Sequence, residues 1–283
     1  MPLRCARMPG NDARQEALSA ARAATIERVA TTGSTNDDLL ARIRAAAAAG
    51  ATCFAPLLLV AERQTAGRGR HGRRWHATAG RSLTFSLAWQ PDRSDLAGLS
   101  LAVGVAIADA LDPAGEPPGR IGLKWPNDLW LVDGADDAAQ LRGRKLGGIL
   151  VETAPLGETR VAVVGVGINV VAQAVQDAAS GVASVDEIDP AATPEATLER
   201  IAPALLDALA RFDVAGFAPF AARYAARDLL RGRAVGAADG ATTGIGAGIA
   251  ADGALLVDTG AGVVAVTSGE WRLRLAEPAG SSC

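Results

Sequence analysis

Residues 121–132 read IGLKWPNDLWLV and decide the fold, because they hold two short apolar runs on either side of a turn. Pro126 removes a ladder hydrogen bond and turns the chain between the runs. Four apolar runs follow one another and are typical of strands: Ile121–Trp125, Leu129–Val132, Gly148–Val151 and Arg160–Val166. Consecutive strands of this kind predict hairpins instead of strict βαβ alternation, and therefore an α+β domain built on a mixed sheet.

The chain before this stretch supplies helices and further strands. Leu99–Leu111 is apolar nearly all round over about 13 residues, which favours a buried helix. Ser34 is a good N-cap for a helix that we expect to end at Gly50. Period-two or short apolar runs predict strands at Ile26–Val29, Leu57–Ala61 and Ser82–Trp89.

The chain after this stretch predicts two amphipathic helices, Glu195–Phe212 and Phe217–Leu230, and then a change of composition after Arg233. Short strands rich in Gly, Val and Thr are expected at Thr242–Ile249, Ala254–Asp258, Val263–Val266 and Trp271–Leu275. We therefore divide the chain into an N-terminal arm (1–24), a large domain (25–231) and a small β-barrel-like domain (232–283). The last is too small to be very stable alone.

Composition excludes several classes of protein. The 283 residues are 49% hydrophobic, and 28 Lys+Arg against 31 Asp+Glu give a net charge of −3, so no global basic field would hold nucleic acid or a membrane surface. Cys5, Cys53 and Cys283 share no metal-ligand spacing, and no apolar run reaches the roughly 18 residues of a membrane span. We expect a soluble, cytoplasmic protein.

The most unusual segment is AGRGRHGRRW at residues 66–75, which places four arginines within seven positions. Glycines let a backbone approach a ligand closely, and arginines neutralise several oxyanions at once. This combination of glycines and arginines suits the binding of a polyphosphate or a phosphoanhydride. The alternatives are a solvated basic turn or an RNA-contacting patch, which are less favoured between two apolar strand runs in a near-neutral protein.

Four further segments are weak signals when each is taken alone. They are Ser34-Thr35-Asn36, which an N-cap explains; the strand end Lys124-Trp125-Pro126-Asn127-Asp128; Arg144-Lys145-Leu146-Gly147-Gly148, where Lys145 could be a strand-flanking charge; and Gly165-Val166-Gly167-Ile168-Asn169. The last is a G-x-G without the third glycine of a dinucleotide fingerprint.

Together and in this order, the five segments resemble the biotin–protein ligase family over roughly residues 25 to 275. The resemblance implies a catalytic domain of the class II synthetase-like type followed by a small SH3-like β-barrel, which Gly248-Ile249 and Gly253-Ala254-Leu255 match. It also implies a two-step reaction with biotin and ATP as substrates and Mg²⁺ as a cofactor. Biotinyl-5′-AMP forms first, and a carrier lysine then displaces AMP.

The resemblance assigns roles to named residues. The biotin-binding residues are expected to be Ser34, Thr35, Asn36, Gln64, Arg68, Gly69, Arg70 and Lys145. The nucleotide-binding residues are expected to be Arg70, Trp75, Asn127 and Asn169. The catalytic charges are expected to be Arg68, Arg70, Lys124 and Lys145. Asp128 is a candidate for the metal, whose ligands otherwise stay unknown. Neutral polar groups suit the ureido ring of biotin, which has both donors and an acceptor.

The expected partner is the biotin carboxyl carrier domain of a biotin-dependent carboxylase, with a homodimer as an option. The 24 residues before the large domain are too few for a DNA-binding winged helix, so we expect a monofunctional ligase without sequence-specific DNA binding. Two departures stand out: an insertion at 133–143, which we expect to extend a hairpin, and Asp37, where the family commonly has an amide. A lipoate–protein ligase, a nucleic-acid-binding protein and an inactive biotin sensor are the open alternatives.

Overall fold

The computed structural model describes residues 24–113, 120–132, 143–173, 181–238, 240, 242–269 and 271–273. Its large sheet has seven strands: β1 (Thr25–Thr32), β2 (Leu57–Gln64), β3 (Ser82–Trp89), β4 (Ile121–Lys124), β5 (Asp128–Val132), β6 (Gly143–Leu156) and β7 (Thr159–Asn169). They lie in the order β1-β2-β3-β7-β6-β5-β4. Only β1 and β2 pair in parallel, and all other neighbours are antiparallel, so the predicted mixed sheet is confirmed.

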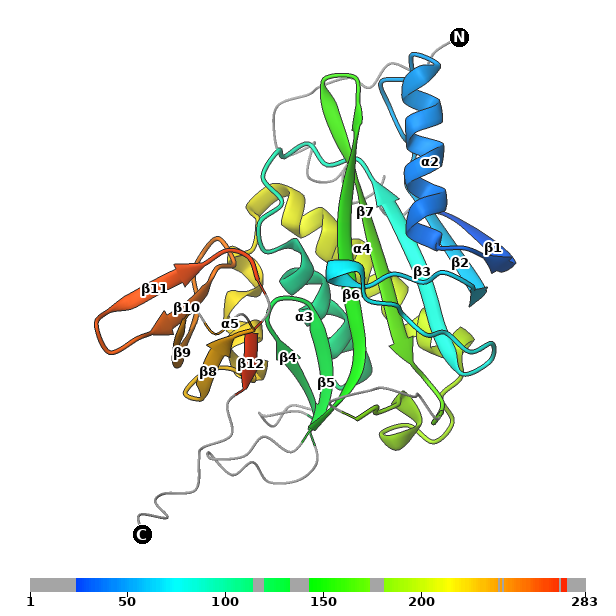
Figure 1. Ribbon diagram of the computed structural model, residues 1–283. Coiled ribbons are helices and arrows are strands. Elements are labelled where there is room, and N and C mark those ends of the chain that lie inside the picture. The colour runs from blue at the N-terminus through cyan, green and yellow to red at the C-terminus, as the bar shows by residue number, and fades with distance from the viewer. Residues whose placement is uncertain are drawn as a thin grey trace.

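Helices cover both faces of this sheet (Figure 1). On one face, α2 (Thr35–Ala48) buries Leu39, Leu40 and Ile43 against β2, β3, β6 and β7. On the other face, α3 (Leu99–Leu111) and α4 (Pro194–Ala215) pack on the alternate strand residues and on each other. Alternate side chains of a strand point to opposite faces, so the sheet separates two cores.

The N-terminus of α2 follows the predicted capping. The side chain of Ser34 accepts a hydrogen bond from the backbone N–H of Asp37, and Asp37 and Asp38 lie in the first turn. A side-chain acceptor and two carboxylates at this end satisfy free N–H groups and favour the helix dipole. Ser34, Thr35 and Asn36 are buried as a result, and they lie above the sheet.

The C-terminal segment forms a second, antiparallel sheet in the order β11-β10-β9-β8-β12. Its strands are β8 (Ala234–Ala237), β9 (Thr243–Ile249), β10 (Leu255–Asp258), β11 (Val263–Val266) and β12 (Trp271–Leu273). This agrees with the small SH3-like domain that the resemblance implies. The sequence patterns did not predict β8, whose four residues include one glycine and two alanines.

The predicted helix over Phe217–Leu230 is wrong. A 3₁₀ turn at Ala218–Phe220 is followed by α5, which spans Ala221–Arg227 and ends there. The chain then becomes extended at Asp228, and the N–H of Leu229 donates to the carbonyl of Leu123 at 3.0 Å. Pairing with the end of β4 therefore replaces the last helical turn that the apolar spacing predicts.

Buried contacts join the two sheets. The indole Nε1 of Trp125 donates to the carbonyl of Gly253 at 3.0 Å. A Cβ on Gly253 would lie 2.6 Å from the Cα of Gly98, so the small sheet touches the start of α3. The domain boundary at 231/232 stays a prediction. Most of the 133–143 insertion and the arm up to residue 23 lie outside the described residues. No described helix has the length and apolarity of a membrane span.

Candidate active site

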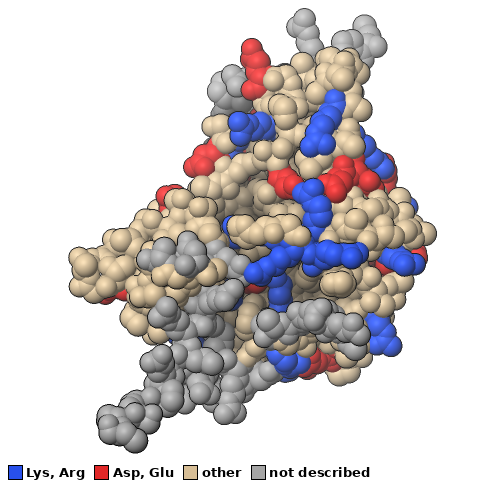
Figure 2. All heavy atoms as spheres, viewed as in Figure 1, with Lys and Arg blue, Asp and Glu red and all other residues tan. Residues whose placement is uncertain are grey.

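One cavity of about 150 Å³ lies over β6 and β7, beneath the arginine-rich loop. Figure 2 shows lysine and arginine side chains gathered across a hollow on this face of the molecule. The predicted site residues that line the cavity are Ser34, Thr35, Asn36, Gln64, Arg68, Gly69, Arg70, Trp75, Lys124, Asn127, Asp128 and Lys145. Asn169 does not line it. The side chain of Asn169 is buried and lies 3.4 Å from the carbonyl of Lys145.

Three glycines on the two central strands make the floor of the cavity. Gly165 and Gly167 on β7 pair with Leu150 and Gly148 on β6. A Cβ at Gly165 would lie 2.9 Å from Cγ of Asn36, and a Cβ at Gly167 would lie 2.6 Å from Nε1 of Trp75. The G-x-G motif therefore gives two side chains the space to lie flat on the sheet.

Neutral polar side chains form one end of the cavity. Ser86 Oγ donates to Asn36 Oδ1 at 2.5 Å and lies 2.6 Å from Thr35 Oγ1. The N–H of Thr35 donates to Gln64 Oε1 at 2.8 Å. Because Ser86 and Asn36 are buried, these bonds hold the amide of Asn36 in one orientation.

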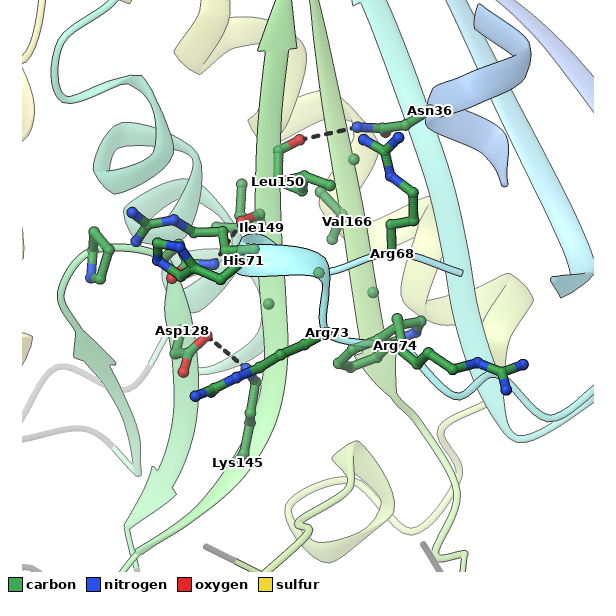
Figure 3. A pocket seen from close by; sticks show the side chains of 18 of the residues that line it. Asn36, Arg68, His71, Arg73, Arg74, Asp128, Lys145, Ile149, Leu150 and Val166 are labelled. Carbon is green, nitrogen blue, oxygen red and sulfur yellow. Dashed lines mark hydrogen bonds and ion pairs between the residues drawn. The ribbon is translucent and has the colours of Figure 1, made fainter. Parts of the chain in front are cut away.

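The opposite end of the cavity carries an ion pair. Lys145 Nζ lies 2.7 Å from Asp128 Oδ1, and the two side chains are 32% and 19% exposed. A register shift in the β5–β6 pairing pairs Leu129 with Gly147 and Trp130 with Lys145. This bulge brings the Lys145 side chain to the same face as Gly148, above which Nζ lies. Figure 3 shows the pair at the far end of the pocket from Asn36.

The arginine-rich loop is a small hairpin. Arg68 and Arg74 form an isolated antiparallel bridge, the N–H of Gly69 donates to the carbonyl of Arg73 at 2.7 Å, and that of Trp75 donates to Gly67 at 2.9 Å. Its tip is the 3₁₀ turn Arg70–Gly72, in which His71 has a φ of 54°. The loop is therefore held together by its own backbone hydrogen bonds.

Comparison with known proteins gives two matches along the chain. Residues 50–169 match the biotin/lipoate A/B protein ligase family, and residues 230–271 match the biotin protein ligase C-terminal domain. The chain belongs to the biotin/lipoate A/B protein ligase family. The two matches fall on the two sheets, in the order that the sequence resemblance implies.

Relatives within this ligase family carry biotin ligase names. The biotin–[acetyl-CoA-carboxylase] ligase of Mycobacterium tuberculosis is 41% identical over 172 residues, which are 59% of this chain and 53% of the relative. The enzyme of that name from Paracoccus denitrificans is 38% identical over 169 residues, 57% of this chain and 66% of the relative. The match therefore spans about half of the first relative and about two thirds of the second.

A solved structure supports the fold of this family member over nearly its whole length. The biotin protein ligase from Aquifex aeolicus, solved in complex with biotin and ATP, superposes with a TM-score of 0.70 at 27% identity. The superposition covers 89% of this chain and 99% of that one. The arrangement of a large mixed sheet with a small C-terminal sheet is thus shared by the two proteins.

The structure adds Trp271, which lines the cavity, and three residues that bind side chains of its lining: Ser86, Glu152 and Asp37. The sequence patterns did not reveal these roles. Ser86 and Glu152 lie within strands, where a polar residue gives no motif. Trp271 is buried on β12 and lines the cavity from the C-terminal sheet. The signal for Ser86 was its place among apolar neighbours on β3, because a buried serine needs a hydrogen-bond partner.

Proposed function

We propose that the protein activates biotin with ATP, forming biotinyl-5′-AMP and pyrophosphate, and transfers the biotinyl group to a lysine of a carrier protein. One observation carries this proposal: a single cavity has a neutral, hydrogen-bonding end at Ser34–Asn36 and a charged end at Lys145. A substrate with a neutral polar ring at one end and a carboxylate at the other matches this polarity. The Aquifex aeolicus relative, which shares the fold, was solved with biotin and ATP.

The neutral end fits the ureido ring of biotin. Ser34, Thr35, Asn36 and Gln64 line this end, and each carries an uncharged hydrogen-bonding group. If unpaired charged side chains stood there, binding a neutral ring would strip them of water at a cost of several kcal/mol. Uncharged side chains avoid this cost, and they select a ligand by matching its hydrogen-bond donors and acceptors.

The charged end fits the first chemical step. An oxygen of the biotin carboxylate forms a bond to the α-phosphorus of ATP, while the bond from that phosphorus to the pyrophosphate oxygen breaks. Negative charge builds on the phosphoryl oxygens, and Lys145, Lys124 and Arg70 provide positive charge on the cavity wall. Asp128 holds Nζ of Lys145 in place before the substrates arrive.

The nucleotide is expected beside Trp75 and Asn127. The indole Nε1 of Trp75 is buried and has no hydrogen-bond partner among the residues that the structure describes. A buried donor of this kind costs stability unless a ligand or water accepts from it, which is consistent with an acceptor on a bound molecule. Asn127 already donates to the carbonyl of Ile149 at 2.8 Å, so its side chain braces the turn after Pro126.

Mg²⁺ fits the cavity through one carboxylate. Asp128 lines the cavity, and the described residues contain no cluster of three or more metal-ligating side chains. Mg²⁺ bound to a nucleotide takes most of its ligands from phosphates and water and needs one or two carboxylates from the protein. The ion would offset the charge of the triphosphate, and Asp128 remains the candidate residue for it.

In the second step the amine of a carrier lysine forms a bond to the biotinyl carbonyl, and AMP leaves with the bonding electrons. The amine loses a proton in this step, because a lysine with a pKa near 10.4 is protonated at neutral pH. The loop over the cavity limits the access of water to the mixed anhydride meanwhile. We propose the biotin carboxyl carrier domain of a carboxylase as the acceptor. The homodimer stays a prediction. Analytical ultracentrifugation would measure the oligomeric state.

The test is to incubate the protein with ATP and Mg²⁺ plus either biotin or lipoate, and to identify adenylates by mass spectrometry. Biotinyl-AMP and pyrophosphate are expected with biotin. A second reaction adds a carrier domain, with a carrier whose acceptor lysine is changed to arginine as the control. Lipoyl-AMP alone would support a lipoate ligase, and biotin binding without any adenylate would support an inactive sensor. Either result would refute the proposed function.

A further inference from the structure

Glu152 joins the arginine-rich loop to the neutral end of the cavity. It lies on β6, two residues beyond Leu150, on the pocket face of the strand. Its Oε2 accepts a hydrogen bond from Asn36 Nδ2 at 2.8 Å, and its Oε1 accepts from Nη2 of Arg68. One carboxylate thus binds a residue of helix α2 and a residue of the loop. Figure 3 shows Arg68 beside Asn36 at this end of the pocket.

Asp37 supplies the second partner of Arg68. Nη1 of Arg68 donates to Asp37 Oδ1 at 2.7 Å, and Asp37 lies in the first turn of α2. The guanidinium is therefore held by two carboxylates from two different elements, α2 and β6. Because the loop is paired with itself through its backbone, holding Arg68 restrains the whole hairpin.

The contact between Arg68 and Asp37 is more exposed to solvent than the contact between Glu152 and Asn36. The side chains of Arg68 and Asp37 are 41% and 47% exposed, so their pairing is screened by solvent. Glu152 is 25% exposed, and Asn36 is 4% exposed. The remaining acceptor of Asn36 Nδ2 is the carbonyl of Leu150, at a longer 3.4 Å. Without the carboxylate, the amide nitrogen of Asn36 would keep one weak bond in a buried place.

We propose that Glu152 is a positioning residue that sets both the orientation of the Asn36 amide and the position of the loop over the cavity, and that Asp37 contributes to the position of the loop alone. Neither carboxylate needs to touch the substrate for this role. The effect on biotin rests on the proposed function, whereas the effect on the loop does not. Losing the Glu152 charge should therefore affect two properties, and losing the Asp37 charge should affect one.

The loop is tested first, in the ligand-free protein, by trypsin, which cleaves after the arginines between residues 68 and 74. The variants are Glu152→Gln, Asp37→Asn and the control Glu27→Gln. Glu27 forms a comparable exposed ion pair with Arg42 at 2.6 Å, away from the loop. Cleavage within the loop, followed by mass spectrometry, should be about two- to fivefold faster in both test variants, the range expected for exposed ion pairs. The control should match the wild type, and so should cleavage outside the loop.

Biotin affinity is tested next, by calorimetry on the same samples. Glu152→Gln should weaken biotin binding by about tenfold, because a hydrogen bond from a buried amide to a charged partner is lost. Asp37→Asn should weaken biotin binding by no larger a factor than the one by which it speeds loop cleavage. Adding Asp37→Asn to Glu152→Gln removes both charged partners of Arg68 and should speed loop cleavage beyond either single variant.

Several results would overturn the proposal. Unchanged loop cleavage in Asp37→Asn, which lies at an exposed site and is not expected to affect folding, would show that Arg68 does not hold the loop. Equal losses of biotin affinity in both variants would show that Glu152 has no separate effect through Asn36. A wild type that binds no biotin would refute the proposed function instead, and trypsin cleavage alone would then decide the role of the two carboxylates in the loop.

Discussion

The substitution Gly165→Ala tests whether the glycine floor shapes the neutral end of the cavity. The added Cβ would lie 2.9 Å from Cγ and 3.1 Å from Nδ2 of Asn36, and closer still to Oδ1. Carbon atoms are best separated by about 3.5–4.0 Å, so the amide must retreat by at least about 0.5 Å. Gly165 has a negative φ, so alanine itself is acceptable to the backbone and the effect is purely steric.

Asn36 has little freedom to retreat. Its Oδ1 accepts from Ser86 at 2.5 Å, and its Nδ2 donates to Glu152 at 2.8 Å. Overpacking of a well-packed interior costs about 1–3 kcal/mol, and each weakened hydrogen bond costs about 1 kcal/mol more. We expect a fall of about 2–4 kcal/mol in the free energy of unfolding, and a loss of biotin affinity of about a hundredfold.

The matched control is Gly33→Ala, one residue before Ser34, where a Cβ would meet nothing within 4 Å. Chemical denaturation gives the stability of both variants, and calorimetry gives the biotin affinity. The control should keep both values near those of the wild type. If Gly165→Ala also keeps both, Asn36 does not lie tightly on the floor, and the role given to the G-x-G motif is wrong.

Three further predictions concern the charged groups. Lys145→Ala should stay folded but form biotinyl-AMP about a hundredfold more slowly, because one charge-stabilising contact contributes about 3 kcal/mol to such a step; unchanged pyrophosphate release would make Lys145 a strand-flanking charge. Arg70→Ala should release biotinyl-AMP faster than Arg74→Ala, because Arg70 is at the hairpin tip whereas Arg74 lies at its base and donates to the carbonyl of Thr65; equal retention in a filter-binding assay would contradict a lid. Asp228, between α5 and β8, has its pKa raised from 3.8 to about 6, chiefly by burial. Its carboxyl is therefore favoured in the protonated form in the folded state, and this contribution to stability is lost as the pH rises from about 4 to about 6. Asp228→Asn should match the wild type near pH 4 and exceed its unfolding free energy by up to about 3 kcal/mol at pH 8; urea titrations that show no such divergence would count against the burial effect.

Periodicity predicted the elements whose own residues determine them. Ser82–Trp89 and Leu99–Leu111 have in the structure the bounds that the sequence indicates, because the first alternates apolar and small polar residues and the second is apolar nearly all round. The Ser34 cap is equally local. The helix over Phe217–Leu230 failed because backbone pairing of Leu229 with Leu123, about a hundred residues away, stabilises an extended chain there.

Within the site, motifs predicted the residues that stand in unusual local sequence, and tertiary structure supplied the rest. The arginine-rich loop was found from composition alone. Glu152 could not be found, because its role depends on the strand register that brings it opposite Asn36 and Arg68. Lys145 was found, but its direction depends on a bulge that no sequence pattern marks. Trp271 reaches the cavity from another sheet.

The concentration of arginines in the loop raises a problem that the structure answers. Like charges this close repel one another, yet the loop has a regular hairpin geometry. Arg68 is neutralised by Asp37 and Glu152, and Arg74 donates to the carbonyl of Thr65. At the other end of the cavity, Lys145 is neutralised by Asp128.

These internal partners have a consequence for ligand binding. A phosphate that contacts Lys145 must compete with Asp128, so part of the attraction is spent on replacing a 2.7 Å ion pair. In return, the ammonium group is already in position when the substrates bind, and no reorganisation is needed during the reaction. Changing Asp128 to Asn would therefore strengthen the binding of a simple polyphosphate and yet slow adenylation, a pair of opposite effects that a purely attractive role for Lys145 does not produce.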